Sequence, residues 1–367
     1  MRSSVIGLDL GDHFIKAVEL VKKGKKLLVS EVAHFPVPKG AIANGLLVNP
    51  EVFKRAISQV LEAYVFQGKN VVMGVPGEQT IIKIIQVPAN ISQKKPVMFE
   101  FIRDDIQSEL STPVEKLYFD FQVLGTRMSE KGNVYDVLFA AVKKEHVDPY
   151  IEVFKSLGLN VIAADAELLA EARTLYLLTN EEDLELTYVL LNISSKTTTI
   201  SFFENGTLAY TRLIDMGASM FVRQVSEFKG ISEREAEYLL NQRNILEEEE
   251  NQQLKNIIAG AMKSLIREIH RVIAYYQSNI SSGGGKFTGI ISGGGALLKG
   301  FDTLLSEELG FPITKNRTLS YLEPMDAERL HSDVLYEISP LVSTAFGLAL
   351  WEYVDMLPSL AGGGDSR

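Results

Sequence analysis

Residues Gly289-Ile-Ile-Ser-Gly-Gly-Gly-Ala-Leu-Leu-Lys-Gly300 carry the most specific pattern in this chain. A strand predicted over Phe287–Ser292 runs into three glycines, and an amphipathic helix is predicted over Ala296–Leu309. Glycines at such a junction let a phosphate or a sugar–base face approach backbone N–H groups and the positive end of a helix. The pattern is neither a Walker A loop nor a dinucleotide fingerprint. Local chemistry alone fits a tight strand-to-helix turn as well as a ligand site.

A second feature is one order of elements that occurs twice. Each time, a β-rich run enters a short polar loop, which begins at Asp9 or at Asn192, and a hairpin follows with its turn at Gly24 or Gly206. The repetition indicates an internal duplication, with chance similarity of two β-meanders as the alternative. The predicted strands are Val5–Leu8, Phe14–Val21 and Leu27–Phe35, and again Thr187–Leu191, Thr198–Phe203 and Leu208–Ile214.

Between the two units, residues 89–165 read as a compact α+β insert. A helix over Asn49–Gln67 and strands over Val71–Val75 and Ile81–Val87 precede it. The insert itself combines helices over Val97–Leu110 and Glu145–Leu157 with strands over Leu117–Leu124, Tyr135–Val142 and Asn160–Ala164. Further helices are predicted over Asp165–Leu178, through most of residues 218–280, and over Ile338–Tyr353.

Composition excludes several classes of protein. A chain of 367 residues with 46% hydrophobic content can bury two cores. A net charge of −10 argues against a nucleic-acid partner, and the basic run Lys22–Lys26 reads as a hairpin tip. The absence of cysteine excludes disulfides and thiolate chemistry. No apolar run approaches the roughly 18 residues of a membrane span, and Met1–Ser4 lacks a signal-peptide pattern, so we expect a cytoplasmic protein without direct membrane insertion.

Three blocks in order resemble the actin, heat-shock chaperone and sugar-kinase superfamily. Asp9-Leu-Gly-Asp-His-Phe-Ile-Lys16 resembles its first phosphate loop (here the first loop), and Asn192–Thr197 lies where the second belongs (the second loop). Gly289–Gly300 resembles its adenosine motif; Gly293–Gly295 is here called the glycine loop. The order favours duplication, because that fold consists of two related lobes that clasp a nucleotide.

Within the superfamily, the chain is most similar to the PilM family of type IV pilus assembly proteins, relatives of the bacterial division protein FtsA. The similarity covers nearly the whole chain. FtsA-like proteins usually end in a basic amphipathic helix, which Ala361–Arg367 lacks, so the pilus family is preferred and an FtsA-like filament-forming protein is the alternative. The segments that carry the resemblance are Gly74–Gly77, Ile84–Pro88, Val142–Asn160, Glu268–Tyr276 and Pro340–Leu350.

The resemblance implies an α/β, actin-like ATPase fold with two duplicated lobes around a nucleotide cleft and a small α+β insert in the first lobe. Residues 1–88 and 166–186 would form the first lobe, with part of helix 338–353 returning to it. Residues 187–217 and 287–337 would form the core of the second lobe, 218–286 its helical subdomain, and 361–367 a flexible tail.

The resemblance also implies ATP with magnesium as the ligand. Asp9 and Gly11 would face the phosphates and Asp9 the metal, while Lys16 would support the first loop. Gly293, Gly294 and Gly295 would contact the nucleotide. Glu268 and Arg271 would flank the ribose, although residues three apart on one helix fit an exposed ion pair equally well.

Both phosphate loops depart from the superfamily. Asp12 and His13 stand where Ser or Thr is usual, and a carboxylate about 4 Å from a phosphate charge costs about 1 kcal/mol in water-like surroundings and about 4 near a protein surface. The second loop begins with Asn192 instead of Asp and continues through Ser194 to Lys196, which could offer phosphate a compensating charge.

A catalytic acid is also hard to place. Asp165 is the only candidate for orienting an attacking water, and capping of the helix that follows would also explain it. We therefore expect nucleotide binding rather than efficient hydrolysis; an active ATPase or kinase is the alternative.

By the same resemblance, the chain would be an assembly scaffold held at the inner membrane through a partner. That partner would be a PilN-like membrane protein, whose cytoplasmic N-terminal segment docks between the first lobe and the insert, near Gly74–Pro76. Contacts with other pilus components, or with a second copy of the chain, stay open.

Overall fold

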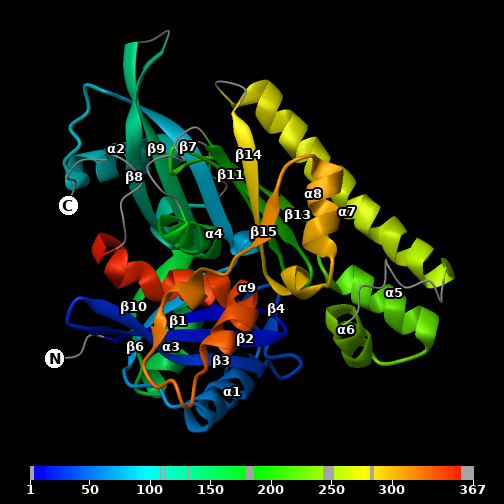
Figure 1. Cartoon of the computed structure of the whole chain (residues 1–367). Helices are drawn as coiled ribbons and strands as arrows, with labels where there is room; N and C mark the ends of the chain where they lie inside the picture. The colour runs from blue at the N-terminus through cyan, green and yellow to red at the C-terminus, as the bar shows by residue number, and fades with distance from the viewer. Residues whose placement is uncertain are drawn as a thin grey trace.

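Two sheets with the same strand order organise the molecule (Figure 1). The computed structural model describes residues 4–107, 110, 112–129, 132–178, 186–242, 252–281 and 285–356. The first sheet has the order β10-β6-β1-β2-β3-β16 and the second β13-β12-β11-β14-β15. Their strands are β1 (Ser4–Leu10), β2 (Phe14–Lys23), β3 (Lys26–Pro36), β6 (Asn70–Val75), β10 (Asn160–Ala166) and β16 (Glu323–Pro324), and β11 (Leu186–Ile193), β12 (Thr198–Glu204), β13 (Thr207–Ile214), β14 (Lys286–Ser292) and β15 (Ile313–Lys315).

The strand directions repeat as well as the order. In the first sheet, β1 and β2, and β2 and β3, are antiparallel, while β1 with β6 and β6 with β10 are parallel. In the second sheet, β11 and β12, and β12 and β13, are likewise antiparallel, while β11 with β14 and β14 with β15 are parallel. The predicted internal duplication is therefore confirmed: each lobe is built on the same five-stranded unit, to which β16 adds a short strand beside β3.

The insert is a three-stranded sheet of β7 (Thr80–Pro88), β9 (Gly132–Lys143) and β8 (Leu117–Ser129), covered by α2 (Lys95–Gln107). All nine residues of β7 pair with β9, whereas β10 pairs with β6 of the first lobe. Strand pairing thus places residues 80–88 with the insert and 160–166 with the first lobe, which corrects the expected division at residues 88 and 165. Pro88 ends a strand, but it does not select that strand's partner.

Helices complete the first lobe. On one face, α1 (Pro50–Ala63) begins at Asn49, whose side chain caps the N–H of Val52, and α3 (Lys144–Ser156) packs beside it. The ring of Phe53 lies 5.3 Å from that of Tyr150. A small hairpin of β4 (Ile42–Ala43) and β5 (Leu46–Leu47) precedes α1.

On the other face, α4 (Glu167–Ala172) and α9 (Ser332–Ala349) lie between the two main sheets (Figure 1). Helix α9 packs closely against both β1 and α4: a Cβ added at Gly7 of β1 would lie 2.0 Å from the carbonyl oxygen of Ala345, and one at Gly347 would lie 1.9 Å from that of Ala170 on α4. Strand β16 pairs with β3, and the apolar face of α9 packs on β1 and β2, so residues 323–337 belong with the first lobe and not with the second, where they were expected.

The segment Ser332–Met356 is long and apolar enough to cross a membrane by composition, with a mean hydropathy of 1.4. However, 67% of its most apolar window is buried inside the protein. Packing between β1 and α4 accounts for this apolar character, because both sides of the helix face protein.

The second lobe carries α5 (Ser219–Lys229), α6 (Glu233–Gln242), α7 (Gln252–Asn279) and α8 (Phe301–Leu309). Its core centres on Phe202, whose ring stacks 4.0 Å from Tyr276 of α7. The expected helix 296–309 is instead a short 3-10 turn, Gly294–Leu297, followed by α8, because Gly300 adopts a left-handed φ of 80° between them. The predicted tail 361–367 lies outside the described residues.

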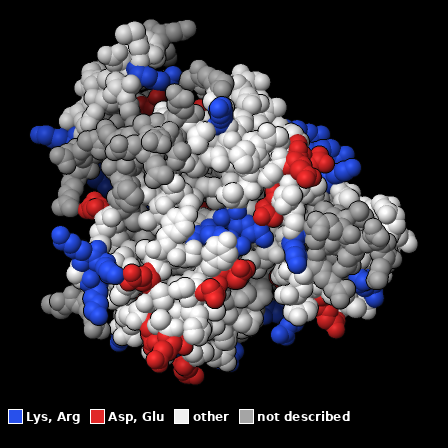
Figure 2. All heavy atoms as spheres, in the orientation of Figure 1, with Lys and Arg blue, Asp and Glu red and all other residues white. Residues whose placement is uncertain are grey.

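Charged side chains of both signs are interspersed over the face seen in Figure 2, which has the orientation of Figure 1. Uncharged residues cover most of the described surface between them. On this face, the described residues therefore do not form the continuous basic stripe that a nucleic-acid backbone requires.

Candidate functional site

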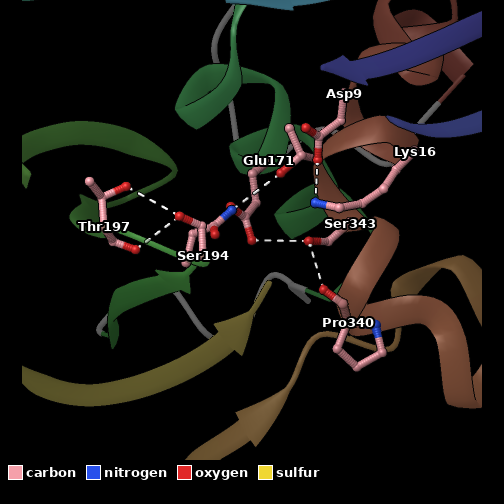
Figure 3. Close-up of polar contacts among 9 residues, drawn as sticks. Asp9, Lys16, Glu171, Ser194, Thr197, Pro340 and Ser343 are labelled. Atoms are coloured by element: carbon pink, nitrogen blue, oxygen red, sulfur yellow. Dashed lines mark hydrogen bonds and ion pairs between the residues drawn. The ribbon is translucent and has the colours of Figure 1, made fainter. Parts of the chain in front are cut away.

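The first loop is held by a pair of charges (Figure 3). Asp9 and Lys16 face each other in the register of β1 and β2, and the Lys16 ammonium donates a hydrogen bond to Asp9 Oδ2 at 2.8 Å. The turn between the strands is closed by the N–H of Gly11, which donates to the carbonyl of Phe14 at 3.1 Å. The hairpin therefore fixes this pair before any contact with the rest of the fold.

Two acids on α4 join this pair, and the sequence analysis missed both. Burial raises the pKa of Glu167 well above its ordinary value, and that of Glu171 above its ordinary value, with nearby Asp9 acting in the same direction. Burial alone would lower the pKa of Lys16, but Asp9, Glu167 and Glu171 outweigh it and raise that pKa. Two acids four residues apart, on a helix that follows a strand ending at this edge, are the signal that could have found them.

Asn192, at the end of β11, joins the second lobe to both central helices. Its amide Nδ2 donates to Glu171 Oε2 at 2.7 Å and to the hydroxyl of Thr344 at 3.2 Å. The hydroxyl of Ser343 donates to the other oxygen of Glu171 at 3.2 Å (Figure 3). An ionised aspartate could not donate these bonds, so the amide has a structural role at the base of the cleft.

The rest of the second loop is a closed turn. The N–H of Ser194 donates to the carbonyl of Thr197 at 2.9 Å, and the Ser194 hydroxyl also donates there, at 3.0 Å (Figure 3). The carbonyls of Ser194 and Ser195 accept from Ala218 and Ser219 at the start of α5, at 2.8 and 2.9 Å. The Ser194 donors are thus engaged inside the protein instead of being turned toward a phosphate.

Asp12 joins three elements. Its carboxylate accepts hydrogen bonds from the N–H groups of Asn44 and Gly45, each at 3.0 Å, and from the Lys196 ammonium at 2.5 Å. Burial by itself would raise the pKa of Asp12, but these donors, Lys196 foremost, hold it below its usual value. The carboxylate is therefore charged at neutral pH, and it links the first loop to the second.

The glycine loop is shaped by close packing. Gly293 has a left-handed φ of 78°, donates to the carbonyl of Pro340 at 2.9 Å, and would place an added Cβ 2.5 Å from the carbonyl oxygen of Ile193. A Cβ at Gly295 would lie 2.5 Å from Cγ2 of Ile193. A Cβ at Gly294, by contrast, meets no described atom within 4 Å. The turn explains the outer two glycines, and only Gly294 faces open space.

Three predicted site residues have other contacts. Glu268 and Arg271 form an ion pair of 2.5 Å on α7, with the Arg271 side chain 75% exposed. Asp165 lies in β10 and pairs with Arg173 at 2.5 Å. The N-cap of α4 is Ala166, so helix capping by Asp165, the second explanation offered for it, is wrong.

A metal has few protein ligands in this cleft. Among the described residues, no group of three or more acids, histidines or cysteines is arranged to hold an ion. Asp9, the predicted magnesium ligand, already accepts the Lys16 ammonium. Magnesium usually binds through one or two carboxylates together with substrate phosphates and water, so Asp9 fits such an ion only alongside a phosphate-bearing ligand.

A small pocket of about 10 Å³ lies at the carboxyl end of β6. It is where the sequence analysis placed partner docking, between the first-lobe sheet, the 44–45 turn and α3. The Tyr150 hydroxyl donates to the carbonyl of Gly45 at 3.2 Å and closes one side. Leu10, Gly45, Met73, Gly74, Val75, Pro76, Gln79, His146, Val147 and Tyr150 line it.

The chain was compared with models of protein families and with solved structures of known proteins. A model of the family described as type IV pilus assembly protein PilM matches residues 7–353. A chain in the structure of a PilM–PilN type IV pilus biogenesis complex is 22% identical, with a TM-score of 0.81 over 95% of this chain and 98% of that one.

More distant structures share the fold. The ethanolamine utilization protein EutJ from Carboxydothermus hydrogenoformans is 15% identical, with a TM-score of 0.53 over 95% of this chain and 90% of that one. MreB5 of Spiroplasma citri, bound to AMPPNP, is 13% identical, with a TM-score of 0.53 over 96% of each chain. The fold is therefore that of the actin-like ATPases, as expected.

Proposed function

The chain belongs to the family of the type IV pilus assembly protein PilM, and from this premise we propose that it is a cytoplasmic scaffold for pilus assembly at the inner membrane. In this role it binds ATP between its lobes and docks the cytoplasmic N-terminal segment of a PilN-like membrane protein. The observation that carries the proposal is the family match over residues 7–353. Similarity over 95% of the chain to a member of a PilM–PilN complex supports it.

The cleft supports binding more than turnover. Lys196 would offer a cationic group and Gly294 an open backbone position to a nucleotide, and Asp9, held by Lys16, would be the carboxylate that its magnesium could use. ATP would bring most of the magnesium ligands itself. The two donors of Ser194 are used within the second loop's own turn, which leaves fewer donors to stabilise charge that develops during phosphoryl transfer.

Calorimetric titration with Mg·ATP, followed by a phosphate-release assay on the same sample, tests this. We expect measurable binding and turnover far below about one per second, the low end of ordinary enzymes. Turnover at that rate would refute the scaffold assignment. A titration that shows no heat of binding, together with an unfolding temperature that Mg·ATP does not raise, would refute ATP as the ligand.

Hydrolysis is the second candidate function, and one observation favours it. Glu167 begins α4 at the edge where β6 ends, and its carboxylate lies near Asp9 and Lys16. It is better placed than Asp165 to orient water, because Asp165 is paired with Arg173. The raised pKa of Glu167 brings its carboxyl toward the range that suits a general base near neutral pH, so slow hydrolysis lost in Glu167→Gln would support this candidate.

For partner docking, an apolar side chain of the peptide would pack over the rim of the pocket at the end of β6, because a volume of about 10 Å³ holds no more than about one water. Gln79 lines its wall and donates to the carbonyl of Asn44 at 2.7 Å, so Gln79→Trp would obstruct the entrance. Met128→Trp adds the same side chain at a hairpin position that is 83% exposed and does not line the pocket. A fluorescent peptide of the PilN-like N-terminal segment should lose at least tenfold in affinity for the first variant only. Equal affinities would exclude this docking position.

A further inference from the structure

One ion pair joins the two loops directly across the mouth of the cleft, from Lys196 of the second loop to Asp12 of the first, at 2.5 Å. We propose that this pair is a clamp that holds the lobes together without nucleotide, and that the phosphates of a nucleotide take Lys196 over when they bind. The proposal rests on the proposed function in one respect, the assignment of ATP to this cleft.

The contacts of Asp12 permit such an exchange. When Lys196 leaves, the carboxylate keeps two backbone donors, Asn44 and Gly45, each at 3.0 Å. No carboxylate is left without hydrogen bonds, so release avoids the large penalty of a stranded charge. The Lys196 side chain is 49% exposed and ends in a compact charge on a flexible stem, so it can turn toward a ligand.

The position of the pair distinguishes it from an ordinary surface ion pair. At the base of the cleft, the lobes are tied by part-buried bonds such as Asn192 to Glu171, at 2.7 Å. At the mouth, the described residues tie the lobes through the more exposed bonds of Lys196 and one from the Thr197 hydroxyl to Glu78, at 3.2 Å. A cleft fixed at its base and held by exposed bonds at its mouth opens there first, because exposed hydrogen bonds yield at the lowest free energy.

A distance measurement without nucleotide tests the clamp. The chain has no cysteine, so Glu62→Cys on α1 and Arg234→Cys on α6, both exposed, provide unique sites for spin labels, one on each lobe. In this background, Asp12→Asn and Lys196→Met should each broaden the interlobe distance distribution toward longer values. Lys26→Met is the matched control, because it breaks an exposed pair with Glu323 inside the first lobe, at 2.9 Å. Distributions unchanged in both cleft variants would overturn the clamp.

Titration of the same proteins with Mg·ATP tests the exchange. Asp12→Asn should tighten binding about two- to fivefold, because it removes the competing carboxylate but leaves Lys196 available. Lys196→Met should weaken binding by a similar factor although it opens the lobes equally. Weaker binding in both variants would overturn the exchange. If the interlobe distances increase in the cleft variants but no protein binds ATP, the clamp is supported, whereas the exchange and the assignment of ATP to this cleft are both refuted.

Discussion

Asn192→Asp would restore the acid that the superfamily usually has at the start of the second loop, and we expect it to destabilise this protein. The amide nitrogen of Asn192 lies 2.7 Å from Oε2 of the buried Glu171, so the substitution sets two carboxylates against each other at a part-buried site. Two unit charges at that distance repel by about 6 kcal/mol at an effective dielectric constant of about 20.

Protonation offers the folded state a less costly alternative. Keeping one carboxyl with an ordinary pKa near 4 protonated at pH 7.5 costs at most about 5 kcal/mol, and at pH 5 about 1.5. The folded pKa of the pair therefore lies above the unfolded value. The penalty vanishes as the pH falls toward the unfolded pKa, and above it grows by about 1.4 kcal/mol per pH unit.

Urea unfolding followed by circular dichroism between pH 5 and pH 8 measures this. Asn192→Ala is the control, because it loses the same bonds to Glu171 and Thr344 without adding a titrating group, at a loss of about 1–3 kcal/mol. The free energy of unfolding of the Asp variant minus that of the Ala variant should fall steadily as the pH rises. A difference that stays constant within about 0.5 kcal/mol over this range would refute the assigned contact.

Four further predictions concern other contacts in the structure. Gly7→Ala should lower the free energy of unfolding by about 3 kcal/mol or more, as in severe overpacking, because its Cβ would lie 2.0 Å from the backbone of α9. Gly294→Ala should change the free energy of unfolding by less than about 0.5 kcal/mol but weaken ATP binding measured by calorimetry. Lys16→Met should cost about 3–5 kcal/mol in urea unfolding at pH 8 and less at pH 5, because Glu167 and Glu171, whose pKa values burial raises, take up protons more readily at the lower pH; an equal loss at both pH values would contradict this. Glu268→Ala and Arg271→Ala should each change stability by less than about 1 kcal/mol, as expected of an exposed pair, and a large loss of ATP affinity in either would show that they flank the ribose after all.

Local pattern was enough for most strands and hairpins of this fold, because these follow from neighbouring residues, whereas the helix expected over Ala296–Leu309 proved to be a 3-10 turn followed by α8. The alternation that ends in Asn205-Gly206, both with positive φ, produced the hairpin of β12 and β13 at its expected place. Proximity in sequence also placed Asp9 opposite Lys16, since a short turn fixes the register of the strands that it joins. The glycine loop was found for the same reason, although its φ of 78° at Gly293 serves packing on Ile193.

The partners of these residues were decided by the tertiary structure. Asp12 and Lys196 are 184 positions apart, and Asn192 meets Glu171 and Thr344 only because α4 and α9 cross between the sheets. The sequence around a polar side chain in a loop does not indicate which distant donor will lie beside it, because the packing of the two lobes determines that partner. The sequence alone thus determined the duplicated actin-like architecture and where its loops lie. Tertiary structure decided that the first and second loops bond to each other, because their charges meet only when both sheets are in place.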